Sequence, residues 1–248
     1  MSVVVSFDHV SKRFILHHER AYTLLESMIG LVKPTRRSIE EFWVLKDVSF
    51  EIRTGETFGI IGPNGAGKST VLKLMARIIE PTSGEVTVRG RISPLLELGA
   101  GFHPELTGRE NVYLNAALFG ISQAEAQDRY DDIVEFSELQ DIIDVPLKHY
   151  SSGMYMRLGF AVAANIIPDI LLVDEVLAVG DEAFQRKCLR RIEEFRTEGR
   201  TIVFVSHDLD TVRRICQRTL WLDHATVQAV GPTDDVVNAY LHHVNEPV

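Results

Sequence analysis

The stretch that decides the fold is Gly62-Pro63-Asn64-Gly65-Ala66-Gly67-Lys68-Ser69-Thr70, which fits the pattern G-x-x-x-x-G-K-[ST] at every defined position. An apolar run over residues 58–61 precedes it and predicts a buried strand, and residues 71–75 follow it with the character of a helix. Glycines let backbone N–H groups converge on phosphate oxygens, and the start of the helix adds its dipole. This strand–loop–helix context predicts a nucleoside triphosphate site rather than a Gly-rich turn that holds nothing.

The loop predicts specific contacts to the nucleotide. We expect Lys68 to reach the β- and γ-phosphates, and the Ser69 hydroxyl to ligate Mg²⁺. The candidate nucleotide-binding residues of the loop are Gly62, Asn64, Gly65, Gly67, Lys68, Ser69 and Thr70.

Length and composition limit the class of protein. The chain has 248 residues, 45% hydrophobic and 25% charged, which is typical of a soluble globular protein with one large domain or a domain and a subdomain. Its net charge of −9 does not indicate a nucleic-acid surface, so we expect no nucleic-acid partner. No apolar run reaches the ~18–20 residues that a membrane helix needs, and the N-terminus does not resemble a signal peptide. Cys188 and Cys216 have no metal-site or disulfide-framework spacing.

Two strands, expected over residues 3–7 and 44–52, flank a segment of different character over residues 15–42. We expect a helix in this segment that ends before Pro34. Its apolar residues fall on one helical face: Leu24, Leu25, Met28, Ile29 and Val32. Two interpretations stay open, a surface helix packed on the domain's own core and an amphipathic element that faces a membrane or a membrane protein.

Further along the chain, residues 85–88 and Ile92 suggest a short sheet, and residues 107–147 are mostly helical in pattern. Two short apolar runs, 170–173 and 201–205, fit central parallel strands that are covered on both faces. The helical stretch 181–196 is expected to connect them as a crossover. Thr233 can cap a last helix.

Polar residues follow both apolar runs. Asp174 suits Mg²⁺ and Glu175 could polarise an attacking water, although acids also cap strand ends without a catalytic role. The phosphate loop upstream favours the functional interpretation. His207 follows the second run, and parallel strands end at one edge of a sheet, beside the phosphates. His207 is therefore a candidate γ-phosphate sensor.

The order of these motifs resembles the nucleotide-binding subunit of ABC transporters from Phe7 to about Tyr240. The motifs are the phosphate loop, Tyr150-Ser151-Ser152-Gly153-Met154, Asp174-Glu175 and Ser206-His207. The resemblance implies that the nucleotide is ATP, that Glu175 is the catalytic base and that His207 is the switch histidine. A helix that begins near Ser151 would supply N–H groups to a γ-phosphate.

The resemblance also implies that two copies of the chain share each nucleotide. Ser151 and Gly153 would contact the γ-phosphate that the second copy holds, and Asp181 falls where the family has a dimer-interface aspartate. Phe14 falls where an aromatic ring stacks on adenine. The working unit would be a homodimer with two ATP molecules between the chains.

Some positions depart from the common family pattern and resemble one branch of it. Ser152 and Met154 replace a glycine and a glutamine, and the loop over residues 95–102 lacks the usual glutamine, with Glu97 as the nearest substitute. These positions, with segments 97–111 and 176–181, resemble the ATPases that export bacterial O-antigen, capsule and teichoic acid. The helical insertion over residues 15–42 is also characteristic of that branch.

The branch implies partners and a location. The partners would be two transmembrane permease subunits and a lipid-linked glycan as transported substrate, and the chain would lie peripherally at the cytoplasmic face of the bacterial inner membrane. The insertion would lie near the place where the glycan enters. We expect no separate C-terminal sugar-binding domain in this chain.

The fold class we expect is α/β, a P-loop NTPase of ABC type in a single domain over residues 1–248. It should have a mostly parallel core sheet, an antiparallel edge sheet near the N-terminus, a helical subdomain over about 95–165 and a C-terminal strand and helix over 223–248. An ABC-type ATPase acting on nucleic acid or translation is the alternative, and it would need a coiled-coil insertion or a second ATPase domain. A GTPase would need an Asn-Lys-x-Asp loop, which the sequence lacks.

Overall fold

A computed structural model describes residues 2–17, 39–94, 99–165, 168–174 and 180–245. The strands are β1 (Val3–His17), β2 (Ile39–Arg53), β3 (Thr57–Ile61), β4 (Ser83–Val88), β5 (Ile92–Pro94), β6 (Ile170–Val173), β7 (Thr201–Val205), β8 (Arg218–Asp223) and β9 (Thr226–Pro232). The helices are α2 (Lys68–Met75), α3 (Gly108–Leu118), α4 (Gln123–Asp128), α5 (Tyr130–Ser137), α6 (Ser152–Asn165), α7 (Glu182–Thr197), α8 (Leu209–Ile215) and α9 (Thr233–Asn245). Two short 3₁₀ turns, η2 (Gln140–Ile142) and η3 (Leu147–His149), lie between α5 and α6.

The core sheet has six strands in the order β5-β6-β7-β3-β8-β9, and only β9 is antiparallel to its neighbour. The expected α/β fold with a mostly parallel sheet is confirmed. Helix α7 connects β6 to its parallel neighbour β7, as the crossover prediction required. Strand β3, which leads into the phosphate loop, lies in the middle of the sheet between β7 and β8.

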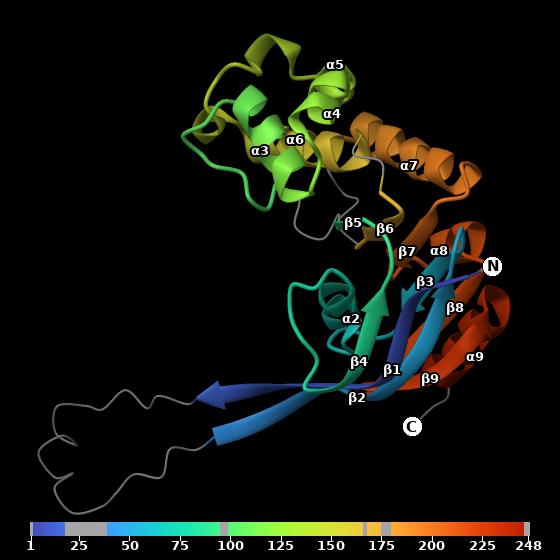
Figure 1. Ribbon diagram of the computed structural model, residues 1–248. Helices are drawn as coiled ribbons and strands as arrows, with labels where there is room; N and C mark the ends of the chain where they lie inside the picture. The colour runs from blue at the N-terminus through green and yellow to red at the C-terminus, as the bar shows by residue number, and fades with distance from the viewer. Residues whose placement is uncertain (1, 18–38, 95–98, 166–167, 175–179, 246–248) are drawn as a thin grey trace, which may run out of the picture.

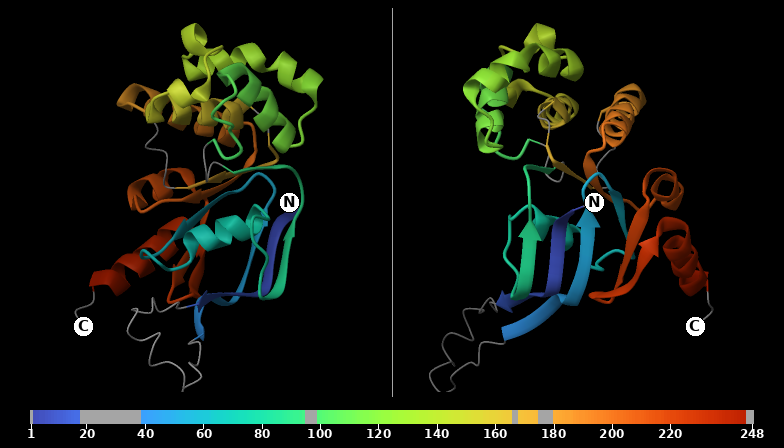
Figure 2. Two further views of the ribbon diagram at one scale, coloured as in Figure 1. Left: turned by 90° about the vertical axis from the view of Figure 1, so that its left-hand side faces the viewer. Right: turned by 45° about the vertical axis from the view of Figure 1, so that its right-hand side comes forward.

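The sheet is covered on both faces, which explains why its strands read as unbroken apolar runs. Successive strand residues point to opposite faces. Ile60 packs in a cluster with α2 and the N-terminal sheet, whereas Ile61 packs in a second cluster with α6, α7, α8 and α9. Figure 2 shows these helices and the smaller sheet around the parallel strands.

The N-terminal sheet is antiparallel, with the strand order β2-β1-β4. Its first two strands are longer than the sequence predicted, because backbone pairing continues to His17 opposite Ile39. The expected helical segment over residues 15–42 is therefore wrong at both ends, where residues 15–17 and 39–42 are strand. In Figure 1 this ribbon extends away from the rest of the molecule. The apolar helical face from Leu24 to Val32 lies outside the described residues.

The short sheet expected from residues 85–88 and Ile92 does not form. Strand β4 pairs with β1 in the antiparallel sheet, whereas β5 pairs with β6 in the parallel sheet. The chain changes sheets at Arg91, whose N–H donates to the Asp169 carboxylate at 2.8 Å and whose carbonyl accepts the Ile170 N–H at 3.0 Å. Pairing of β5 with β6, which is distant in the sequence, thus overrides the local sequence pattern that suggested one short sheet.

Helices α3 to α6 form a helical subdomain with a core of its own, on top of the molecule in Figure 1. Helix α6 belongs to two cores, because Leu158 packs among the subdomain helices whereas Phe160 packs under the parallel sheet. The subdomain is thereby attached to the ATPase core along α6. Its expected start near residue 95 lies outside the described residues.

The C-terminal strand and helix are β9 and α9. Helix α9 begins at Thr233, whose buried hydroxyl donates to the Cys216 carbonyl at 2.9 Å and bonds to the Thr219 hydroxyl at 2.9 Å. This side chain anchors the start of the helix to β8. In the described part of the chain, every helix is too short or too polar to cross a lipid bilayer.

A capping box at the start of α3 gives a test of the fold. The Thr107 hydroxyl accepts the Glu110 N–H at 3.2 Å, and the Glu110 carboxylate accepts the Thr107 N–H at 2.8 Å. We expect Thr107→Ala to lower the free energy of unfolding by about 1 kcal/mol in urea denaturation. Thr107→Ser keeps the hydroxyl and should retain most of that stability. Equal losses in both variants would contradict the capping role.

Candidate functional site

The phosphate loop turns sharply at three glycines, and at two of them a side chain would not fit. Gly62, Gly65 and Gly67 have φ of 145°, 81° and 107°, which favour glycine. A Cβ on Gly62 would lie 2.0 Å from the Leu222 carbonyl oxygen, and one on Gly67 would lie 2.8 Å from the Val44 carbonyl oxygen. The loop therefore packs backbone to backbone against β8 and β2, which fixes the direction of its N–H groups.

Lys68 is buried at the start of α2. Its ammonium donates to the carbonyl oxygens of Gly62 at 2.8 Å and Pro63 at 3.0 Å, both within the loop. Ser69 is exposed and Thr70 is half-buried. The cation is held where a phosphate bound to the loop would meet it, beside the positive end of a helix.

Asp174 lies close to this lysine. Burial lowers the pKa of Lys68, and the Asp174 charge partly offsets that effect. Burial likewise raises the pKa of Asp174, which the Lys68 charge and a hydrogen bond with Ser69 lower. The Ser69 hydroxyl and Asp174 carboxylate are thus neighbouring oxygens of the kind that Mg²⁺ prefers. The residues present fit that ion.

The structure brings three of the predicted motifs together. The phosphate loop, Asp174 and His207 follow β3, β6 and β7, which are parallel and adjacent in the order β6-β7-β3. All three therefore lie at the same edge of the sheet, where ligands bind in open α/β sheets. His207 is exposed there.

Sequence reasoning missed the residue that holds the His207 loop in place. Asp208 caps α8, since its carboxylate accepts the N–H groups of Asp210 at 3.1 Å and Thr211 at 3.2 Å. The Ser206 hydroxyl accepts the Asp208 N–H at 3.0 Å. The sequence does contain a signal for this cap, because an aspartate directly before a helical stretch is typical of a helix N-cap.

Two predicted residues cannot be placed. Glu175 and Glu97 lie outside the described residues, and their roles stay predictions.

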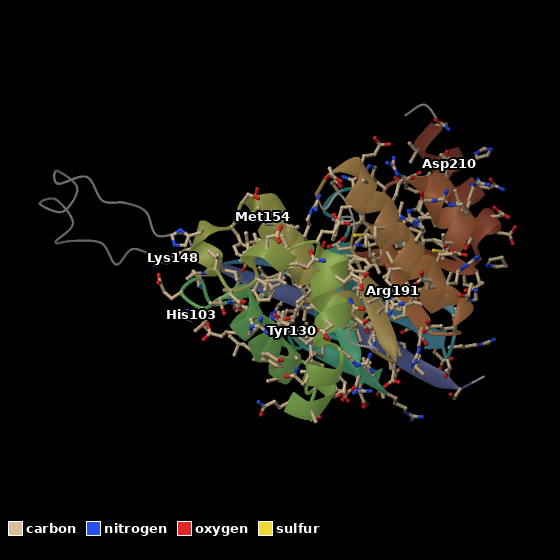
Figure 3. The ribbon with its side chains drawn as sticks, turned by 90° about the horizontal axis from the view of Figure 1, so that it is seen from above. His103, Tyr130, Lys148, Met154, Arg191 and Asp210 are labelled. Atoms are coloured by element: carbon tan, nitrogen blue, oxygen red, sulfur yellow. The ribbon has the colours of Figure 1, made fainter. Side chains whose placement is uncertain are left out.

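Ser151 and Gly153 lie at the start of α6. The Ser151 hydroxyl accepts the Met154 N–H at 3.2 Å, and the Ser151 N–H lies 3.4 Å from the Met154 sulfur. Met154, which replaces the usual glutamine, thus helps to fix the turn that carries Ser151. Figure 3 shows Met154 at this end of α6.

Ser151, Gly153 and Asp181 share a hollow of about 610 Å³, which Glu138 and Arg157 also line. Among the described residues, none from the phosphate loop lines it. The phosphate-loop edge of the sheet and the hollow at the start of α6 are therefore separate surfaces of the chain.

Asp181 has two partners within its own chain. One carboxylate oxygen accepts the Phe184 N–H at 2.9 Å and caps α7, and the other accepts the Arg157 guanidinium at 2.6 Å. Sequence reasoning placed Asp181 at a dimer interface and missed Arg157.

Phe14 lies on the β1–β2 ribbon, opposite Phe42, and both rings are exposed. The Lys12 ammonium lies 5.2 Å from the centre of the Phe14 ring. Trp43 is also half-exposed and directly precedes Val44, which lies against Gly67. Sequence reasoning missed Phe42 because it assigned residues 15–42 to a helical insertion, and it missed Trp43 because that residue lies between the insertion and the strand expected over residues 44–52. The adenine-stacking role of Phe14 stays a prediction.

The loop geometry predicts unequal effects of adding a methyl group. Gly62→Ala should lower the free energy of unfolding by more than about 3 kcal/mol, because its Cβ collides with the Leu222 carbonyl. Gly65→Ala meets no atom within 4 Å and should cost roughly 1–2 kcal/mol, the strain of a left-handed alanine. Thermal unfolding of both variants measures the difference, and equal losses would contradict the close backbone packing.

Comparisons with known proteins show the family. Residues 45–178 match the family model described as ABC transporter. The chain is 46% identical to the O-antigen export system ATP-binding protein RfbB of Klebsiella pneumoniae, over 97% of this chain and 98% of that protein. It is 41% identical to the teichoic acids export ATP-binding protein TagH of Listeria monocytogenes serotype 4b (strain F2365), over 96% of this chain and 70% of that protein.

Solved structures give the same result. This chain matches the solved structure of an ATP-binding subunit of an ABC transporter with a TM-score of 0.74 at 25% identity, over 96% of this chain and 93% of that chain. A dimeric ATP-binding cassette in a post-hydrolysis state with ADP and Pi bound has a TM-score of 0.70 at 24% identity, over 92% of this chain and 98% of that chain, which supports the fold alone. With its phosphate loop, Asp174 and His207 at one edge of the sheet, this chain belongs to the ABC transporter family and is one of its ATP-hydrolysing subunits.

Proposed function

We propose that this chain is the motor subunit of an exporter that moves a lipid-linked polysaccharide of O-antigen, capsule or teichoic-acid type across the cytoplasmic membrane. The observation that carries the proposal is the 46% identity to an O-antigen export ATP-binding protein over nearly the whole of both chains. The teichoic acids export protein supports the same substrate class, because it matches over 96% of this chain.

Two copies of the chain would work as a head-to-tail pair. The phosphate-loop edge and the hollow with Ser151 and Gly153 are separate surfaces of one chain, so neither half-site encloses a nucleotide by itself. Pairing the two surfaces across a symmetry axis would form two complete sites with one ATP in each. ATP would then favour the closed pair because it binds that state better.

The chemistry would be divided among named residues. Lys68 would hold the β- and γ-phosphates, and Ser69 and Asp174 would hold Mg²⁺, which offsets phosphate charge when bound. Glu175 would accept a proton from the attacking water. His207, which follows the strand β7 between β6 and β3, would contact the γ-phosphate and move when that phosphate leaves.

The remaining partners would be membrane proteins. Two transmembrane permease subunits would hold the pair at the cytoplasmic face of the inner membrane, and the lipid-linked glycan would pass between them. Residues 15–42, including the exposed Phe42 on the ribbon, would lie near the place where the glycan enters.

The phosphate-loop assignment predicts a binding defect. Lys68→Ala should weaken ATP binding at least tenfold in a fluorescent-nucleotide titration, because a charge-assisted contact to phosphate is lost. Lys148→Ala removes an exposed lysine paired with Glu105 and should bind ATP as the natural chain does. Unchanged affinity in Lys68→Ala would contradict the assignment.

The catalytic assignment predicts a defect in turnover instead. Glu175→Gln should reduce kcat by roughly 10²–10⁴-fold while ATP affinity stays nearly unchanged. Glu182→Gln, an exposed glutamate at the start of α7, is the matched control and should keep the natural rate. Near-normal hydrolysis in Glu175→Gln would remove that residue from the role.

The exporter proposal is tested by capturing partners. Tagged Glu175→Gln chain is recovered from its native membranes with ATP, and the partners are identified by mass spectrometry, with ADP as the control. We expect a stoichiometric polytopic membrane protein with ATP, and a co-purified lipid-linked glycan would identify the substrate. Recovery of only soluble or nucleic-acid-bound partners would contradict the proposal.

A further inference from the structure

Arg157 joins three elements that meet beside the second half-site. It lies on α6, four residues after Gly153, and therefore on the same face of that helix. One guanidinium nitrogen donates to the Glu138 carboxylate at 3.0 Å, and the other donates to the Asp181 carboxylate at 2.6 Å. The two carboxylates come from different parts of the chain, and we call this arrangement the Arg157 fork.

Each carboxylate is fixed by its own second partner. Glu138 ends α5 in a left-handed conformation with φ of 59°, and it also accepts the Lys187 ammonium of α7 at 3.0 Å. Asp181 caps α7 through the Phe184 N–H at 2.9 Å. That hydrogen bond, together with the Arg157 charge, holds the pKa of Asp181 below its usual range, so the carboxylate is ionised at neutral pH.

The guanidinium is also confined by close packing. Its centre lies 4.9 Å from the centre of the Phe184 ring, and Phe184 is buried in the core under the parallel sheet. A Cβ on Gly180 would lie 3.3 Å from the Arg157 Nε. Arg157 is only 20% exposed, whereas its two carboxylate partners are at least half-exposed. The arginine is therefore the fixed point of the fork.

The fork forms part of the hollow that carries the candidate signature residues. Arg157, Glu138 and Asp181 line the same space as Ser151 and Gly153. Because α7 packs on the core sheet and α6 carries the helical subdomain, the fork joins the start of the signature helix to the ATPase core.

We propose that Arg157 is a positioning residue for ATP hydrolysis. Its fork fixes the start of α6 against the start of α7, so that Ser151 and Gly153 face the partner's nucleotide in the orientation that hydrolysis requires. The inference rests on the proposed function, because it assumes that two copies share each nucleotide. It gives Asp181 an anchoring role within its own chain, beside the expected contact with the second copy.

The geometry requires arginine at this position. A lysine would keep the charge and much of the stem but would offer one compact ammonium, which cannot hold two carboxylates at fixed, separate positions. Ion pairs with exposed carboxylates contribute little to stability. Loss of the fork should therefore disturb the orientation of Ser151 and Gly153, and hence the turnover of ATP, more than it lowers the stability of the fold.

Arg191 provides a matched control. It also joins α7 to α6, with its Nε donating to the Ala164 carbonyl at 3.2 Å, and its guanidinium lies over Phe195 at 4.6 Å. It pairs with Glu194 and is 21% exposed, close to the value for Arg157. However, it lies at the opposite end of α6, apart from Met154 in the view of Figure 3.

The test compares full-length Arg157→Ala, Arg157→Lys and Arg191→Ala with the natural chain. Three quantities are measured: the melting temperature, the Kd for a fluorescent ATP analogue at low protein concentration, and kcat with KM for ATP hydrolysis. Both Arg157 variants should bind nucleotide within about twofold of the natural Kd, since the phosphate loop is unaffected, and should lose roughly 10–100-fold in kcat. Arg191→Ala should keep the natural kcat.

Each alternative outcome is distinct. Natural kcat in Arg157→Lys would overturn the positioning role of the fork. Equal losses of kcat and of melting temperature in Arg157→Ala and Arg191→Ala would also overturn it, because they would indicate that Arg157 contributes packing alone. If Arg157→Ala does not fold, Asp181→Asn and Glu138→Gln each remove one carboxylate charge, and natural kcat in both would overturn the proposal. A natural chain that binds ATP without pairing or hydrolysing it would contradict the shared site of the proposed function, and this inference with it.

Discussion

The close approach of the phosphate-loop backbone to β8 and β2 is the constraint on which the rest of the site depends. At Gly62 there is no room for even a methyl group against the Leu222 carbonyl, and Gly67 is similarly tight against Val44. These contacts fix the loop from two sides, so its N–H groups and Lys68 are directed before any phosphate arrives. Such preorganisation matters because a binding site that must order itself loses affinity by the cost of that ordering.

The loop can be fixed this way because β3 lies in the middle of a sheet that is buried on both faces. Its alternate residues contribute to two separate apolar cores, one with α2 and the N-terminal sheet and one with α6 to α9. Burial on both sides leaves the strand little freedom to move. Parallel pairing with β7, and of β7 with β6, then places His207 and Asp174 at the same edge as Lys68.

The start of α6, with Ser151 and Gly153, is supported differently. Ser151 and Gly153 lie on a helix that belongs to both the subdomain core and the core under the sheet, and its start meets α7 through Arg157 and Asp181. The phosphate-loop edge is thus held by sheet geometry, and the start of α6 by helix packing together with the Arg157 fork. A change in the angle between the subdomain and the sheet would move the start of α6 and leave the phosphate-loop edge in place.

The sequence by itself determined the phosphate loop, the buried parallel strands, the crossover helix and the residues at the strand ends, because each depends on local pattern: glycine spacing, apolar runs and capping groups. It failed where pairing between distant segments decides the outcome. The length of the β1–β2 ribbon depends on His17 lying opposite Ile39, and the separation of β4 from β5 depends on Arg91 meeting Asp169. The Arg157 fork likewise could not be predicted from the sequence, because the two carboxylates that Arg157 binds are 19 and 24 residues away along the chain. Only the tertiary structure decides which distant charges and strand edges meet, because that depends on how whole elements pack.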